Sequence, residues 1–115
     1  MGERIFEIKN YSVKLGDKMT ATFGSQTIEA RGIISCFGAE DQRVIAYFLS
    51  DDSPAPLPVI SGEGKWGCIF LEKALLPVWI DLLRNEKPLF GYINTGYPGW
   101  TNISTSAEPV GEEES

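Results

Sequence analysis

The fold class is decided by residues 11–37, YSVKLGDKMTATFGSQTIEARGIISCF, in which apolar and polar side chains alternate. Val13 and Leu15 flank Lys14, for example, and the same alternation resumes over residues 19–23. A period of two places one set of side chains against a core and the other set in solvent. This stretch therefore predicts half-buried β-strands.

Glycines interrupt the alternation, and each interruption predicts a change in backbone direction. Gly16-Asp17-Lys18 and Gly24-Ser25 have the composition of turns. Gly32 precedes the adjacent apolar pair Ile33-Ile34, so the phase of the alternation breaks there, which is typical of a β-bulge or bend. Gly38–Asp41 is expected to be a hairpin loop.

The chain that follows predicts a buried strand, a long loop and a further strand. Arg43–Ser50 (RVIAYFLS) is apolar at both alternate sets of positions, which is typical of a central strand covered on both faces. Residues 50–64 hold three alternating prolines, which favour an extended loop outside any central strand. Strand character resumes over Lys65–Leu71.

One helix is expected at about residues 75–86. Its apolar residues recur at spacings of three and four: Leu75, Leu76, Trp79, Ile80 and Leu83. Val78 and Leu82 widen this stripe, so we expect a well-covered helix. Pro77 fits the first position of a helix, and the Lys87-Pro88 step ends it.

The last part of the chain predicts a hairpin: a strand over Leu89–Asn94, a turn over Thr95–Gly99 and a strand over Trp100–Ser106. Short turns between consecutive strands favour antiparallel pairing. We therefore predict a mostly β, α+β fold, a curled antiparallel sheet or partial barrel of about 6–7 strands with one helix before the C-terminal hairpin. Residues 1–106 would form one globular domain, and the acidic residues 107–115 a disordered tail.

This order of strands around one helix resembles small-barrel folds, including the oligonucleotide-binding barrel. The resemblance is one of arrangement and covers no sequence motif, so it implies no particular function. The ten lysines and arginines are scattered along a chain of net charge −6, which disfavours nucleic-acid binding. Stacking of a single strand on Trp66, Tyr97 and Trp100 would also need a basic groove.

The residue types exclude several chemistries. The chain has no histidine, which removes the commonest general base and the commonest metal ligand. Cys36 and Cys68 lie in apolar runs and are expected to be reduced core thiols. The match to G-x-G-x-x-G at residues 62–67 sits between a proline-rich loop and a strand, not between a strand and a helix. We therefore expect no cofactor and no metal, and the chain leans away from being an enzyme.

Targeting signals are also missing from this sequence. The N-terminus carries no apolar signal region, and no apolar run approaches the ~18 residues that cross a membrane. We therefore expect a cytoplasmic protein that makes no membrane contact.

The least ordinary feature is a set of aromatic residues in the second half of the chain, and the candidate binding residues are Trp66, Tyr92, Tyr97 and Trp100. Tyr97 and Trp100 flank the Pro98-Gly99 turn, where full burial is difficult. Two interpretations stay open: these rings form an interface anchor or ligand platform, or they form a minor core that closes one end of a barrel.

Two function classes follow from these residues. The first is a small non-enzymatic interaction or binding module that self-associates or binds a protein partner. The second is a small-molecule-binding barrel, or an enzyme that uses carboxylates and tyrosines such as Asp51, Asp52, Tyr92 and Tyr97. Asp51-Asp52 lies at the mouth of the long loop and is the preferred pair for a cation or ligand contact.

Overall fold

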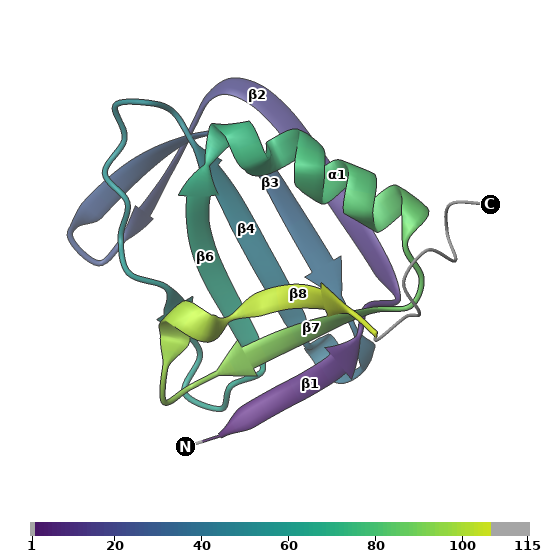
Figure 1. Ribbon diagram of the computed structural model, residues 1–115. Helices are drawn as coiled ribbons and strands as arrows, with labels where there is room; N and C mark the ends of the chain where they lie inside the picture. The colour runs from purple at the N-terminus through teal and green to yellow at the C-terminus, as the bar shows by residue number, and fades with distance from the viewer. Residues whose placement is uncertain (1, 107–115) are drawn as a thin grey trace.

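The computed structural model describes residues 2–106, which form two β-sheets and one α-helix (Figure 1). The elements are β1 (Glu3–Glu7), β2 (Asn10–Phe23), β3 (Gln26–Phe37), β4 (Arg43–Leu49), β5 (Val59–Ile60), β6 (Trp66–Glu72), α1 (Leu76–Asn85), β7 (Leu89–Asn94) and β8 (Asn102–Thr105), with short 3-10 turns η1 (Ala39–Asp41), η2 (Lys73–Leu75) and η3 (Pro98–Trp100). One sheet has the strand order β2-β3-β4-β6-β5 and the other the order β1-β7-β8. The predicted fold class is confirmed, and the two sheets do not close into a barrel. The predicted acidic tail, residues 107–115, lies outside the described residues.

The β2–β3 hairpin follows the predicted alternation and differs from it at one turn. Gly24 has a positive φ of 62° in the two-residue connection, as its lack of a side chain allows. The predicted turn at 16–18 is wrong, because β2 runs through it as one strand whose register to β3 shifts between Leu15 and Met19. The predicted irregularity at Gly32 is confirmed as a register shift between β3 and β4.

The expectation of antiparallel pairing holds for every strand pair of residues 2–106 except one. β4 and β6 run parallel, with Leu49 opposite Glu72 at their carboxyl ends. The proline-rich loop makes the parallel pairing possible, because it returns the chain from the carboxyl end of β4 to its amino end, where Trp66 of β6 lies opposite Arg43. Within it, the short β5 pairs antiparallel with β6, and this strand was not predicted. β1, which pairs with β7, was not predicted either.

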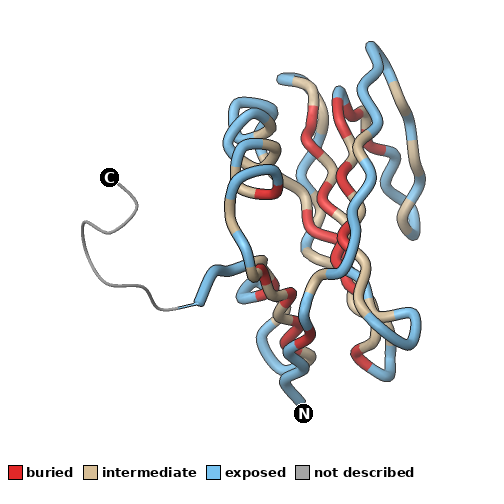
Figure 2. Tube along the Cα trace, turned by 90° about the vertical axis from the view of Figure 1, so that its right-hand side faces the viewer, coloured by how far each residue is buried: buried red, intermediate tan, exposed pale blue. Residues whose placement is uncertain are grey.

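The main core fills the space between the two sheets and under α1, where the buried positions of Figure 2 concentrate. Val44, Ala46 and Phe48 of β4 are fully buried on this side, as expected for a central strand. Phe6 of β1 reaches into the same core. A second, smaller cluster lies on the opposite face of the five-stranded sheet. There, the ring of Phe23 meets those of Tyr47 and Phe70 edge to face, at centroid distances of 5.3 and 5.0 Å.

Helix α1 begins at Leu76 and ends at Asn85, close to the predicted bounds, and Pro77 occupies its first turn as expected. Trp79 packs edge to face on Phe48 at a centroid distance of 5.6 Å. The expectation that the whole helix is well covered is wrong. Leu83 is its one buried residue, and Val78 lies on an exposed flank.

Both cysteines are free and buried, as predicted. They pair across strands with the β4 neighbours Val44 and Ile45, which point to opposite faces of the sheet, so the two thiols lie on opposite faces as well. Burial raises the pKa of Cys36 to about 12 and that of Cys68 to about 11. Neither thiol is therefore a ready nucleophile near neutral pH. Within residues 2–106, no helix has the length and apolar character needed to span a membrane.

Candidate interaction surface

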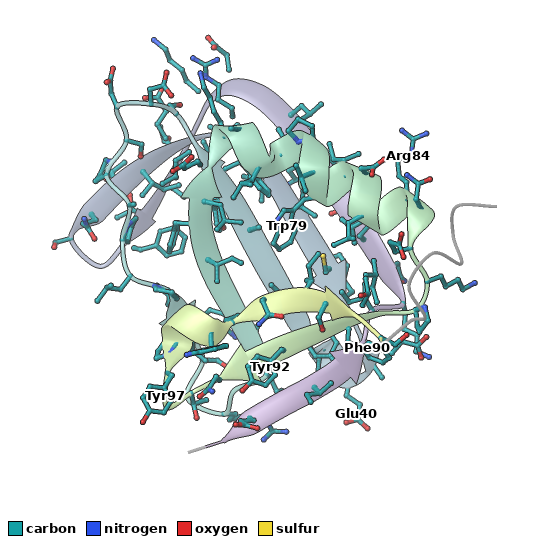
Figure 3. The ribbon with its side chains drawn as sticks, in the orientation of Figure 1. Glu40, Trp79, Arg84, Phe90, Tyr92 and Tyr97 are labelled. Carbon is teal, nitrogen blue, oxygen red and sulfur yellow. The ribbon has the colours of Figure 1, made fainter. Side chains whose placement is uncertain are left out.

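The three-stranded sheet has an outer face that no other part of residues 2–106 covers completely. In β7 the buried residues Leu89, Gly91 and Ile93 face the core. The alternate residues Phe90 and Tyr92 therefore project from the outer face and are only half-buried (Figure 3).

Strand β1 extends this outer face on one side. Ile5 lies directly opposite Tyr92 in the antiparallel register, so the two side chains share a face. The side chain of Ile5 is 66% exposed, while its neighbour Phe6 is buried in the core. Sequence reasoning missed Ile5 because it missed the strand that carries it. The alternation of Phe90 and Tyr92 with buried neighbours was available in the sequence.

A polar network centred on Asn94 holds the turn that follows β7. Asn94 Oδ1 accepts hydrogen bonds from the backbone amides of Gly96 (3.0 Å) and Tyr97 (2.9 Å). Its Nδ2 donates to the hydroxyl of Tyr92 at 3.0 Å. Asn94 is buried and has little access to water, so these protein groups supply the hydrogen bonds that its side chain needs. The predicted binding residue Tyr92 thus also supports the turn.

The N-terminus ties down the same turn. The backbone amide of Thr95 donates to the carbonyl of Gly2 at 2.9 Å, and the hydroxyl of Thr95 lies 2.8 Å from the backbone nitrogen of Gly2. The turn therefore has a defined conformation on both sides before any partner arrives.

This turn presents Tyr97 and Trp100, which lie on either side of Pro98-Gly99, with 70% and 66% of their surfaces exposed. Figure 3 shows Tyr97 projecting beyond the end of β7, on the same side of the molecule as Tyr92. The interpretation that these two rings form a minor core is therefore wrong. We call Ile5, Phe90, Tyr92, Tyr97 and Trp100 the aromatic surface.

Trp66 does not belong to this surface. It begins β6 opposite Arg43 of β4. The next residue, Gly67, faces the core, since an added Cβ there would meet Ile60 and Thr101. Trp66 therefore points to the opposite face of the five-stranded sheet, away from the core. Asn94 thus links the hydroxyl of Tyr92 to the backbone of Tyr97, and the carbonyl of Tyr97 accepts from the amide of Trp100, whereas Trp66 lies on a different sheet.

The acidic candidates lie at a different place, where the parallel strands β4 and β6 end. A cavity of about 570 Å³ opens there between the proline-rich loop and the start of η2, and Asp51 lines it. Asp51 Oδ2 is 3.2 Å from Lys73 Nζ, an exposed ion pair that contributes little to stability. Asp52 does not line this cavity, nor do Tyr92 and Tyr97.

No group of three or more potential metal-ligating side chains occurs in the part of the chain that the structure describes. The four residues of the carboxylate–tyrosine alternative therefore do not share one site, since Asp51 lines the cavity, Tyr92 and Tyr97 belong to the aromatic surface, and Asp52 belongs to neither. Comparisons with protein-family models, with curated proteins and with solved structures found no match to this chain.

The Asn94 network leads to a testable prediction. Asn94→Ala should lower the free energy of unfolding by about 1–2 kcal/mol, because the amides of Gly96 and Tyr97 lose their buried acceptor. Urea denaturation followed by circular dichroism would measure this. Asn85→Ala is the matched control, since Asn85 is exposed at the end of α1. An equal effect of the two substitutions would contradict the role given to Asn94.

Proposed function

We propose that this protein is a non-enzymatic interaction module, which binds an extended, basic segment of a partner protein on the aromatic surface and also self-associates. The observation that carries this proposal is the exposure of Tyr97 and Trp100 on a turn whose backbone is already held by Asn94 and Gly2. A turn whose backbone is fixed before binding loses little conformational entropy when a partner docks on its aromatic side chains.

The neighbouring charges favour a basic partner. Glu3 and Glu7 alternate with Ile5 on β1, so their carboxylates lie on the same face as the aromatic surface. Oε1 of Glu7 lies 3.6 Å from Nζ of Lys9, an exposed ion pair within the same chain. The exposed faces of Tyr97 and Trp100 attract lysine and arginine through cation–π contacts. The carboxylates of β1 and the exposed aromatic rings both favour a partner segment that alternates basic and aliphatic residues.

The backbone of β1 supports an extended partner. β1 is the edge strand of the order β1-β7-β8, so its outer edge has no paired strand among residues 2–106. An added strand would form main-chain hydrogen bonds with this edge, and every second side chain of that strand would lie beside Ile5. Affinity would then come from the backbone and from the aromatic anchors, and selectivity from the acidic residues.

The alternative function, a small-molecule site or enzyme built from carboxylates and tyrosines, has weaker support. Asp51 lines the loop cavity, whereas Tyr92 and Tyr97 belong to the aromatic surface. General acid–base chemistry needs its groups within hydrogen-bond reach of one substrate.

Calorimetric titration with a synthetic hexapeptide that alternates lysine and valine tests the proposal. We expect binding by the full chain, and a dissociation constant at least about tenfold higher for the Tyr97→Ala/Trp100→Ala variant, as for two interface anchors. Leu57→Ala is the control, because Leu57 is 84% exposed on the proline-rich loop. A peptide with glutamate in place of lysine should not bind. Equal binding of both peptides, or no binding at millimolar concentration, would refute this function.

A further inference from the structure

The long strand β2 presents a second unpaired surface, which is separate from the aromatic surface. β2 lies at the end of the strand order β2-β3-β4-β6-β5, so one of its edges has no paired strand among the described residues. Pairing with β3 is regular over Asn10–Leu15 and then becomes irregular up to Met19. A partner strand could therefore add in register along residues 10–15 or along residues 19–23, because only a regular edge templates regular pairing. Of these two segments, residues 10–15 hold the exposed apolar side chains of β2, Tyr11 and Leu15.

This regular segment carries apolar side chains toward the helix side of the sheet. Tyr11 and Leu15 lie opposite Cys36 and Gly32 of β3, which face the core. Even so, Tyr11 is 38% exposed and Leu15 is 67% exposed, since β2 is at the edge of the sheet. Val13 between them packs against the core. These three residues form an apolar row along a free edge.

We propose that two copies of this chain associate by antiparallel pairing of β2 with β2 around a twofold axis at Val13, so that their five-stranded sheets become one continuous sheet. This inference specifies the self-association that forms part of the proposed function. It rests on a different surface from the one that would bind the peptide, so the two can fail separately.

Symmetry limits the registers that such a pair can adopt. A twofold axis perpendicular to the sheet keeps each side chain on its own face of the sheet. Two residues that lie opposite each other in the two copies must therefore have residue numbers that differ by an even number or are equal. An axis at Lys14 would place the two Lys14 ammonium groups opposite each other, which is unfavourable. An axis at Ser12 would place Lys14 opposite Asn10 and leave Leu15 without an apolar partner. The axis at Val13 avoids both problems.

With the axis at Val13, every apolar residue of the row meets an apolar residue. Tyr11 of one copy lies opposite Leu15 of the other, an aromatic–aliphatic pair of the kind that stabilises antiparallel sheets, and Val13 meets its own counterpart. Lys14 lies opposite Ser12, so no like charges face each other. Just beyond the paired segment, Lys9 of one copy approaches Asp17 of the other, which are opposite in charge.

A small groove beside Tyr11 adds a further complementary feature. It has a volume of about 160 Å³ and lies between the start of β2 and the end of α1. Its walls contain the apolar residues Tyr11, Leu83, Pro88 and Leu89 and the charged residues Glu7, Lys9, Glu86 and Lys87. The proposed register places Leu15 of the second copy next to Tyr11, at the side of this groove. The most exposed apolar side chain of β2 thereby gains contact with the ring of Tyr11.

Sedimentation equilibrium of the full chain tests the association itself. We expect a species of twice the 12.7 kDa chain mass. Leu15→Glu should raise the dimer dissociation constant at least about tenfold, because a carboxylate would then face the ring of Tyr11. Tyr97→Ala and Leu57→Glu should leave the dimer intact, since both residues lie away from residues 10–15. A monomer at millimolar concentration, or a dimer that Leu15→Glu does not weaken, would overturn the proposal.

Disulfide trapping tests the register without depending on a destabilising variant. Ser12 and Lys14 are exposed and would lie opposite each other across the axis. A mixture of the Ser12→Cys and Lys14→Cys proteins should therefore cross-link under mild oxidation, and each protein alone should not. Cys36 and Cys68 are buried and should not compete. Cross-linking of Ser12→Cys alone as efficiently as the mixture would show a different register and overturn this one.

Discussion

Phe48→Ala is expected to lower the free energy of unfolding by about 3–5 kcal/mol, enough to unfold many domains of this size. Phe48 is fully buried in the central strand β4, inside the core between the two sheets. Its ring is also the partner of Trp79, with an interplanar angle of 76°. Removing the ring would leave a cavity and would deprive α1 of an aromatic contact that holds it to the sheet.

Urea denaturation with matched controls measures this effect. Tyr97→Ala removes a ring of similar size from an exposed position and should change the free energy of unfolding by less than about 0.5 kcal/mol. Ile69→Val, which removes one methylene from the same core, should cost about 0.5–1.5 kcal/mol. If Tyr97→Ala were as destabilising as Phe48→Ala, the ring of Tyr97 would be packed, and the proposed interaction surface would lose its main support.

Gly91→Val is expected to destabilise the protein by about 3 kcal/mol, at the upper end of the usual cost of overpacking. A Cβ added at Gly91 would clash with the Cζ atom of Phe6, and one added at Gly38 would clash with the Cδ2 atom of the same ring. Phe6 thus occupies a space that exists only because two glycines, one in β7 and one after β3, leave it open. The contact joins the two sheets through a single buried side chain.

A double-mutant cycle distinguishes this contact from a general intolerance of valine in β7. Phe6→Leu should be less damaging in the Gly91→Val background than in the natural protein, because the smaller side chain relieves the clash. Gly62→Val is the control, since nothing lies within 4 Å of a Cβ at Gly62. Additive effects of Phe6→Leu and Gly91→Val in thermal denaturation would show that the two positions do not interact.

Elements with strong local patterns could be predicted from the sequence. The spacing of apolar residues and the position of Pro77 placed α1 within about one residue of its bounds. The alternation in β2 and β3, and the double-sided apolar character of β4, likewise predicted three neighbouring strands. In each case the signal lies within a few residues of the element it describes.

Elements that depend on distant partners could not be predicted in the same way. β1 has only one buried side chain, that of Phe6, and its pairing partner β7 lies at the other end of the chain. The segment at 16–18 has the composition of a turn, yet it continues as a strand because residues 19–23 pair with β3. The parallel alignment of β4 with β6 follows from the path of the long loop between them. No local pattern in the sequence indicates that path.

For the candidate sites, the available chemistry could be predicted from the residue types: no histidine, two thiols in apolar runs, and aromatic residues around Pro98. Which of these side chains share a surface depends on the pairing of the strands and could not be predicted. In the folded chain Tyr97 and Trp100 are exposed, Ile5 lies on the same face as Tyr92, and Trp66 lies on a different sheet. One edge of β2 has no paired strand among residues 2–106. The physical reason is that composition and turn propensity act over a few residues. Exposure and proximity, in contrast, depend on which strands, far apart in the chain, come to pair and which edges stay free.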